Sequence, residues 1–469
     1  MSTLKLKNYS LLLVLIIPFL TLSCKKSSTG PDNEQGPYFN VNQWMNVNMD
    51  FYYFWNDEVP EEVDGTILPQ TYFNSMLNSE DEFSFMSDDA EALLNDLQGS
   101  SFSAGFSAAF GAFSGTDDIF IIVEYVYPGT PADEAGFKRG DIILAINGQR
   151  LNRDNYVDLY YQESDATYLL GAYDAESDAI SETDSTVMVS KSQLVLNPVV
   201  HTSVIEKGNS KIGYMFYAKF LNGANDSFIE VVDQTLEDFQ SQGVNELIID
   251  LRYNGGGTIA SAVNIANSIA PVSTTANEDI FVKYQYNSAL HNKLLEEEGA
   301  DSPNLVLRFS EDPVNLGLDR VFFLTTSGSA SASELLINGL APYMDVVTVG
   351  TPTFGKFYGS FVLTGQSVTP SHSYAIVPVV LKYANANGVT DFRDGLAPDY
   401  EVQEDIVQAV ALGDTTDPMI GKVLEIVTGD QTAKTVRRTL PYRLLDDPVE
   451  LKKGNIFKVK KPRSKPSKF

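Results

Sequence analysis

Cysteine, histidine and basic side chains are scarce in this chain of 469 residues. Its single cysteine excludes an intrachain disulfide bond and a cysteine-rich zinc site. The three histidines, at positions 201, 291 and 372, lie too far apart for metal-ligand spacing, so we expect neither a metal nor another cofactor. Lys and Arg number 33 against 62 Asp and Glu, and the net charge of −29 argues against nucleic-acid binding, which needs a basic face.

The apolar run near the start of the chain is too short to cross a membrane. It covers residues 11–22, whereas a membrane-spanning helix needs about 20 apolar residues. Lysines precede the run, which is typical of the hydrophobic region of a secretory signal. The run leads into Leu-Ser-Cys24, a pattern that resembles the lipobox of bacterial lipoproteins, whose cysteine is lipidated and becomes the mature N-terminus.

This resemblance implies a signal peptide at 1–23, a lipid on Cys24 and a flexible tether at 24–37. It places the protein in the cell envelope, anchored by its lipid to the periplasmic or outer membrane surface. An ordinary signal peptide that ends near a stray cysteine is the alternative.

Apolar side chains are plentiful and permit a large core. Hydrophobic residues make up 43% and aromatic residues 11% of the chain, and the length predicts about two to four domains. Residues 41–56 and 69–98 carry apolar side chains at helical spacing, for which core packing is the plain interpretation. We therefore expect a helical N-terminal domain at 38–100.

Residues 101–200 change to strand-like patterns, at 119–127, 142–146 and 187–196. The string GTPADEAGFKRGDII at 129–143 combines a short helix with a glycine cap, and an Asn-Gly turn follows. This string resembles the core of a PDZ domain. The acidic stretch at 173–186 reads as a solvated loop, with a calcium site as the less favoured alternative.

The PDZ resemblance implies a peptide-binding site. In that family a peptide adds as a strand beside a glycine-hydrophobic loop, and backbone N–H groups bind its terminal carboxylate. The matching loop in this chain contains Gly105 and Phe106.

Residues 201–430 alternate between strand and helix patterns. We expect strands at 211–220, 246–251, 321–324 and 345–350, with helices at 226–242, 258–270 and 332–342. Such alternation predicts a largely parallel sheet. A hairpin at 361–381 and a helical segment at 404–428 follow.

The C-terminal extension, 431–469, ends in a basic tail. Residues 451–469 contain eight Lys or Arg and no acidic residue. A solvated tail is the default interpretation. Folding back onto the acidic body and contact with anionic lipid are the alternatives.

The string DLRYNGGG at 250–257 places three glycines directly after a predicted buried strand. Glycines let a backbone approach a ligand closely with its N–H groups pointing at it. We expect Arg252, in the same string, to make a structural ion pair in the sheet, and Asp250 to do so as well.

The string SGSASASEL at 327–335 lies at a strand-to-helix junction, where free N–H groups and the helix dipole can stabilise an oxyanion. A serine hydroxyl there needs a base. Lys356, in the string TFGK, can serve if burial keeps its amine neutral, and His372 is a second candidate. The other serines of the string, at 327, 329 and 333, are expected to be turn and cap residues.

Taken in order, these segments and the string DGLAPD at 394–399 resemble the C-terminal processing peptidases, also called tail-specific proteases. The resemblance implies that Ser331 is the nucleophile and that Lys356, 25 residues downstream, is the general base. It also implies an oxyanion hole built by the residue after the nucleophile and the glycine loop: Ala332 and Gly256, with Gly255 and Gly257 as alternatives.

The family fold is multidomain, of the α+β and α/β classes. It implies a helical N-terminal domain at 38–100, a PDZ domain at 101–200 and a crotonase/ClpP-like α/β Ser-Lys protease core at 201–430. Many members place a Gln where this chain has Ser360, so we expect a Ser-Lys dyad rather than a triad.

The expected function is that of a serine endopeptidase. Its partners would be envelope or secreted proteins whose accessible C-termini bind the PDZ domain. A non-catalytic PDZ adaptor and a hydrophobic-ligand-binding protein on the same fold are the alternatives. Two simpler interpretations of the motifs remain: Ser331 as a helix N-cap, and 350–356 as a phosphate loop, which Phe357 disfavours because it replaces the Mg²⁺-binding Ser/Thr.

Overall fold

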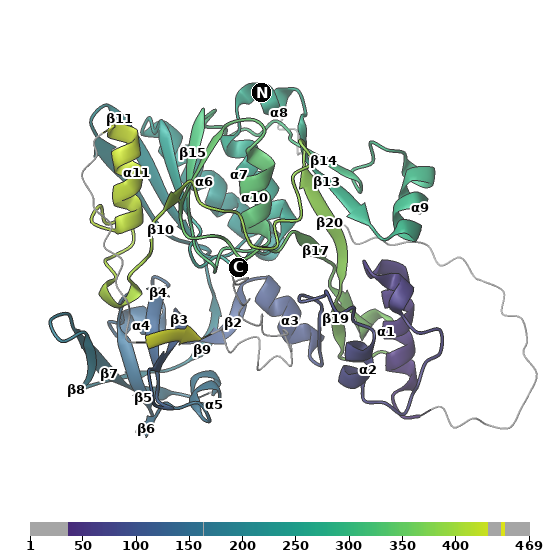
Figure 1. Ribbon diagram of the computed structural model, residues 1–469, viewed down its shortest axis with the longest axis horizontal. Coiled ribbons are helices and arrows are strands. Elements are labelled where there is room, and N and C mark those ends of the chain that lie inside the picture. Colours follow the sequence, from purple (N-terminus) through teal and green to yellow (C-terminus); the bar gives the residue numbers. More distant parts are fainter. Residues whose placement is uncertain (1–35, 163, 430–441, 446–469) are drawn as a thin grey trace, which may run out of the picture.

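The computed structural model describes residues 36–162 and 164–429 and one further strand, β22 (Tyr442–Leu445). The predicted signal peptide, Cys24, most of the tether and the basic tail lie outside the described residues. In the described part of the chain, no helix is both long and apolar enough to cross a membrane. Figure 1 shows a large α/β core, with the PDZ-like region and the N-terminal elements along one side of it.

A six-stranded sheet forms the centre of the core. Its order is β10 (Val199–Lys207), β11 (Ser210–Tyr217), β12 (Glu246–Asp250), β15 (Arg320–Thr325), β16 (Asp345–Gly350) and β21 (Tyr400–Glu401). β10 pairs antiparallel with β11, and the strands from β11 to β21 pair in parallel. The prediction of a largely parallel sheet is confirmed.

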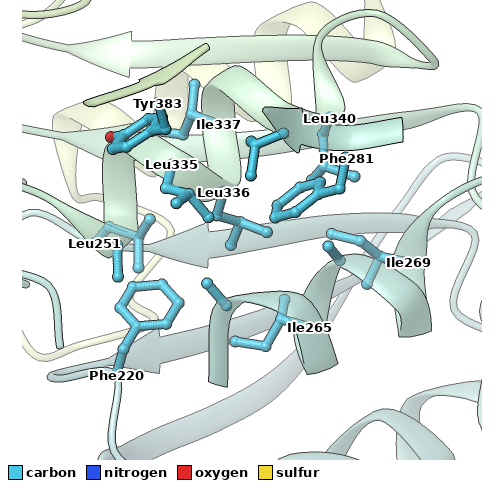
Figure 2. Packing of buried hydrophobic residues seen from close by; sticks show 14 of the residues in the cluster. Phe220, Leu251, Ile265, Ile269, Phe281, Leu335, Leu336, Ile337, Leu340 and Tyr383 are labelled. Atoms are coloured by element: carbon cyan, nitrogen blue, oxygen red, sulfur yellow. The ribbon is translucent and has the colours of Figure 1, made fainter. Parts of the chain in front are cut away.

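Helices cover both faces of this sheet (Figure 1). One face packs against α6 (Ser227–Ser241), α7 (Ile259–Ile269) and α10 (Ala332–Leu340), and the other against α11 (Pro418–Thr428). Neighbouring residues of β12 show why both faces are apolar: Leu247 and Ile249 belong to the first cluster and Ile248 to the second. Figure 2 shows α7 and α10 packed together, with Phe281 beside them.

A second sheet, of four strands, adjoins the core. Its order is β14 (Val306–Arg308), β13 (Ile280–Tyr286), β20 (Val379–Asn385) and β17 (Tyr358–Ser360). The helices α8 (Val272–Ala276) and α9 (Ser288–Glu298) flank β13 in sequence. The predicted hairpin at 361–381 is present, because β18 (Leu363–Thr364) pairs antiparallel with β19 (Ala375–Val377). It belongs to a separate small sheet, in which β1 (Phe85–Ser87) pairs with the other side of β19.

The N-terminal region contains α1 (Phe39–Tyr52), α2 (Pro69–Ser75) and α3 (Ala90–Leu97). The continuous helix predicted over 69–98 is wrong, because the chain leaves the helix after α2 and forms β1. Asp81 accepts hydrogen bonds from the backbone N–H groups of Phe83 and Ser84 at 2.8 and 2.9 Å. Such side-chain bonds compete with helix formation.

The PDZ-like region is a sheet with short helices. Its strands run in the order β3 (Phe106–Phe113), β4 (Ile119–Val126), β5 (Ile142–Ile146), β7 (Ala166–Asp174) and β8 (Ala179–Val189). The smaller elements are β2 (Ser100–Ser103), α4 (Pro131–Glu134), β6 (Gln149–Arg150), α5 (Tyr156–Tyr161) and β9 (Ser192–Val195). The stretch at 173–186 is not a loop: most of it extends the β7–β8 hairpin, and its acidic residues are largely exposed.

Single turns of 3-10 helix connect several of these elements. They lie at Asn56–Glu58, Ala224–Asp226, Gly365–Ser367 and Ile406–Gln408.

Candidate active site

The glycine loop after β12 packs directly on Ser331. Gly256 has φ +102°, and a Cβ atom there would lie 2.7 Å from Cβ of Ser331 and 2.9 Å from the backbone nitrogen of Ala332. Gly257, at φ +144°, approaches the carbonyl oxygen of Phe220 so closely that a Cβ would lie 1.9 Å from it. The loop can therefore reach the start of α10 only because these residues lack side chains.

Backbone N–H groups at this junction differ in their availability. The N–H of Gly256 donates to Oδ1 of the buried Asn254 at 2.9 Å, and the Nδ2 of Asn254 donates to the carbonyl of Tyr217 at 2.7 Å. Within the described residues, no hydrogen bond engages the N–H of Ala332. Of the two predicted oxyanion donors, Ala332 is thus free, whereas the Gly256 N–H is held inside its own loop.

Ser331 lies at the N-cap position of α10 in a strained backbone conformation, with φ +56° and ψ −109°. Residues other than glycine rarely adopt such values, and they persist where the surroundings enforce them. Those surroundings include two neighbouring serines: Ser329 donates to the carbonyl of Leu251 at 2.7 Å, and Ser333 donates to that of Asn254 at 2.8 Å. Both are structural residues, as expected.

The carboxylate of Glu334 joins the Ser331 segment to the Lys356 segment. Its Oε2 accepts from the backbone N–H of Ser331 at 2.9 Å and from that of Lys356 at 2.8 Å. Its Oε1 accepts from the Thr353 hydroxyl and the Gly355 N–H, both at 2.6 Å. A single buried side chain therefore fixes both predicted dyad residues by their backbones.

Burial raises the pKa of Glu334, although the four hydrogen bonds to its carboxylate act in the opposite direction. The side chain is fully buried, so these donors replace the water that an ionised carboxylate would otherwise need. Because these hydrogen bonds replace those to water, an acidic residue can be buried between the Ser331 and Lys356 segments.

Lys356 follows Gly355, whose φ of +99° and close contact with the Arg393 carbonyl again require glycine. The Nζ of Lys356 lies 5.3 Å from the ring centroid of Phe83, a residue of the N-terminal region. The hydroxyl of Tyr383 on β20 lies 3.3 Å from the carbonyl oxygens of both Ser331 and Lys356. Groups distant in sequence thus enclose the lysine.

Two further predicted residues do not join this arrangement. The Oγ of Ser360 is buried without a hydrogen-bond partner among the described residues, so it does not orient Lys356 as a Gln would. The ring of His372 packs edge-on against Trp44 of α1, with 4.7 Å between centroids, and neither ring nitrogen has a partner in the described region. Burial lowers the pKa of His372. Its contacts place it with the N-terminal helices rather than with Ser331.

Arg252 and Asp250 each make an ion pair as expected; the two pair with each other and belong to a larger buried network. The Arg252 side chain is 1% exposed and contacts Asp250 at 2.8 Å, Glu404 at 2.8 Å and Asp417 at 2.9 Å. Arg139, from the PDZ-like region, also pairs with Glu404. The network therefore links the PDZ-like region to the strand that carries the glycine loop.

The carboxyl of Glu404 lies at the centre of this link. Burial alone would raise its pKa, but the charges of Arg252 and Arg139 lower the pKa to about 2. Tyr253 adds a hydrogen bond of 2.6 Å to the same carboxylate. Glu404 is thus ionised at neutral pH.

The predicted peptide-binding loop lies at the start of β3. Gly105, at φ +93°, packs against Thr130 and donates its N–H to the Ser103 hydroxyl at 3.0 Å. The Phe106 ring is buried and stacks on Phe137 at 5.4 Å. Phe106 is therefore a core residue at this position rather than the exposed wall of an open pocket.

Sequence reasoning missed Glu334, Phe83, Tyr383 and Glu404. Glu334 could have been found, because it stands three residues after Ser331 in the Ser-x-x-Glu pattern of a helix start. The other three come from segments whose approach depends on tertiary packing. In the described part of the chain, no cluster of metal-ligating side chains is present.

Comparisons with known proteins agree with this arrangement. Residues 40–85 match the peptidase S41 N-terminal domain, 122–165 match a PDZ domain and 211–402 match peptidase family S41. A carboxyl-terminal-processing protease of Picosynechococcus sp. is 27% identical over 65% of this chain and 66% of its own length. A chloroplastic C-terminal processing peptidase of Tetradesmus obliquus is 25% identical over 67% of this chain and 63% of its own length. The match thus spans just under two thirds of these relatives.

A solved structure has the same fold. The crystal structure of a putative S41 protease from Bacteroides fragilis superimposes with a TM-score of 0.69. It covers 87% of this chain and all of that one, at 24% sequence identity. The predicted fold class, with an N-terminal domain, a PDZ domain and a mixed α/β core, is confirmed.

Proposed function

Because the chain belongs to peptidase family S41, we propose that it is a serine endopeptidase in which Ser331 is the nucleophile and Lys356 the general base. The observation that carries this proposal is the Glu334 carboxylate, which binds the backbone N–H groups of both residues. The strained backbone of Ser331 supports it, since such strain concentrates at functional sites.

The proposed reaction is acyl transfer to Ser331. The neutral amine of Lys356 takes the proton of the Ser331 hydroxyl while its oxygen attacks the scissile carbonyl. The N–H of Ala332 stabilises the oxyanion, and the Gly256 N–H joins it once it exchanges its bond to Asn254. The ammonium of Lys356 then protonates the leaving amine, and water hydrolyses the acyl-enzyme.

The substrates we propose are proteins with accessible C-termini, bound by the PDZ domain beside Gly105 and Phe106. The relatives named above process carboxyl termini, which supports this class of substrate. We propose the domain boundaries that the sequence predicts: an N-terminal domain at 38–100, a PDZ domain at 101–200 and a peptidase domain at 201–430. The alternative, a non-catalytic binding protein on the same fold, predicts an intact structure without peptide-bond hydrolysis.

Paired substitutions test the dyad. Ser331→Ala and Lys356→Ala should each reduce kcat by at least about 10⁴-fold, and the double variant should lose little more because both residues serve one proton transfer. Ser327→Ala is the matched control, because this exposed serine in the same string should retain full activity. Near-normal cleavage by Lys356→Ala would place the base elsewhere. Loss of fluorophosphonate labelling in Ser331→Ala but not in Ser327→Ala would identify the nucleophile.

We also propose that Cys24 carries a lipid and holds the enzyme at the surface of an envelope membrane. The apolar run before it and its place as the single cysteine support this. Cys24→Ser should move the protein from the membrane fraction to the soluble fraction. A variant that still sediments with membranes would contradict lipid anchoring and direct attention to the basic tail.

A further inference from the structure

The strand β22, from the C-terminal extension, pairs with β3 of the PDZ domain. The ladder is antiparallel and joins Tyr442 to Phe113 and Leu445 to Phe110. Figure 1 shows this strand, coloured yellow, beside β3 at the end of the sheet. A segment from the end of the chain therefore occupies the outer edge of the PDZ sheet.

The occupied edge is the one on which the proposed substrate would bind. β3 begins directly after the Gly105 loop and has β4 on one side and β22 on the other. Without β22, β3 would be an edge strand with unpaired backbone groups, which is what an added peptide strand needs. Tyr160 of α5 contacts Phe106 and Phe110 at 6.1 and 5.1 Å between centroids, so this helix flanks the same strand.

The polarity of β22 also matches that of a substrate. Its register advances from Phe113 towards Phe110, so the chain direction points to Phe106 and the Gly105 loop. A peptide whose terminal carboxylate binds that loop must run in the same direction. Leu445 is not a chain terminus, however, because 24 residues follow it. β22 pairs with the half of β3 that is distant from the loop, Phe110–Phe113, and supplies no carboxylate at the loop itself.

Building on the function proposed above, we propose that β22 occupies the peptide site of the PDZ domain in cis and that a substrate C-terminus must displace it. The segment is a built-in competitor that reserves the site for chain ends. A substrate that ends at the loop and continues along β3 past Phe110 makes the same pairs as β22 there and adds pairs and charge-assisted hydrogen bonds next to the loop, so it has the advantage over β22. Internal protein segments lack this advantage and are excluded.

The covalent link favours this occupancy. Only residues 430–441 separate β22 from the described part that ends after α11, so the segment is present at a high effective concentration.

The charges of the two segments also favour occupancy of the site by β22. Residues 101–200 contain fifteen acidic and five basic residues, a net charge of −10, whereas the tail at 451–469 carries eight basic residues and no acidic one. High salt should weaken this contribution.

Proline substitution in the full-length chain tests the proposal. The variant Arg443→Pro with Leu444→Pro removes two consecutive backbone N–H groups, one of which must face β3 in an antiparallel ladder. The control, Lys452→Pro with Lys453→Pro, places the same two prolines beyond β22. Both are made in Ser331→Ala protein, and binding is measured by anisotropy with a labelled peptide that ends in an apolar residue and a free carboxylate. The amidated peptide is measured in parallel.

A site occupied in cis about 90% of the time weakens the apparent affinity about tenfold. The β22 variant should therefore bind the free-acid peptide about tenfold more tightly than the parent chain, at every protein concentration, and the control should match the parent. Equal affinities in all three proteins would overturn the proposal. A gain that disappears on dilution would assign β22 to the site of a second copy of the chain and overturn the proposal as well.

Hydrogen exchange separates this inference from the proposed function. Amides of β3 at 110–113 should exchange faster in the β22 variant than in the parent or the control, whether or not any peptide binds. If the three proteins bind neither peptide but differ in exchange as stated, PDZ recognition of C-termini is wrong while occupancy by β22 stands. If exchange at β3 is unchanged, occupancy is wrong whatever the peptides do.

Discussion

At the scale of single residues, the Glu334 carboxylate determines how Ser331 and Lys356 meet. Glu334→Gln keeps the shape of the side chain but replaces one acceptor oxygen with an NH₂ group that faces backbone donors. The loss of two charge-assisted hydrogen bonds, each worth about 1.5–3 kcal/mol, should displace one of the two segments. We expect kcat to fall at least about 100-fold, with a smaller change in KM, measured by steady-state cleavage of a short peptide.

Glu425→Gln provides the control for this prediction. Glu425 is a buried glutamate on α11, where it pairs with Lys422 away from Ser331. Its substitution should leave kcat within about twofold. Equal losses of kcat in the two variants would mean that Glu334 acts through general stability rather than by positioning the dyad.

The residues of the candidate site differ in how far the sequence reveals them. Ser331 and Lys356 stand in motifs with fixed spacing, so a single chain suffices to propose them. Phe83 and Tyr383 cannot be found in this way, because only the packing of a distant turn and of β20 brings them to Lys356. The N–H of Gly256 shows a further limit, since its bond to Asn254 depends on the exact course of the loop.

At the scale of elements, the glycine loop and the start of α10 form one unit. Gly256→Ala places a Cβ within 2.7 Å of Ser331 and forces φ +102° on a residue that disfavours it. We expect kcat to fall at least about 100-fold and the free energy of unfolding to drop by about 1–3 kcal/mol. Enzyme assays and denaturant titrations measure the two effects.

Gly255→Ala is the neighbouring control. No atom lies within 4 Å of a Cβ added at Gly255, so the variant should fold normally and keep most of its activity. If Gly256→Ala is as active as Gly255→Ala, the loop does not contribute to catalysis through close contact with Ser331.

Elements with strong periodicity were predictable, and elements set by long-range pairing were not. The alternation of β11, α6, β12 and α7 is visible in the sequence because each helix buries one face and each strand is apolar. β1 escaped prediction because its three residues form a strand only against β19, almost 300 residues later. β22 escaped for the same reason, since its partner β3 lies more than 300 residues earlier.

At the scale of the whole molecule, buried charges join the PDZ domain to the α/β core. Arg139 contributes from the PDZ side, while Arg252 and Glu404 contribute from the core. Buried networks of this kind are costly when one partner is lost. The orientation of the PDZ domain therefore depends on the ionisation of Glu404, which makes it sensitive to acid.

Glu404 should make the protein lose stability in a defined acid range. Its pKa is about 2 in the folded protein against 4.5 ordinarily, so the ionised carboxylate stabilises the fold fully above pH 4.5. This stabilisation is lost as the pH falls from 4.5 towards 2, and the difference in pKa corresponds to about 3 kcal/mol. Denaturant unfolding at pH 6 and pH 3 measures this loss of stability.

The variant Glu404→Gln lacks the titrating group. Its free energy of unfolding should therefore change less than that of the parent between these pH values. Arg153→Met, at an exposed arginine of the PDZ domain, should behave like the parent. A parent and a Glu404→Gln protein with equal pH dependence would show that this carboxylate does not link the two domains energetically.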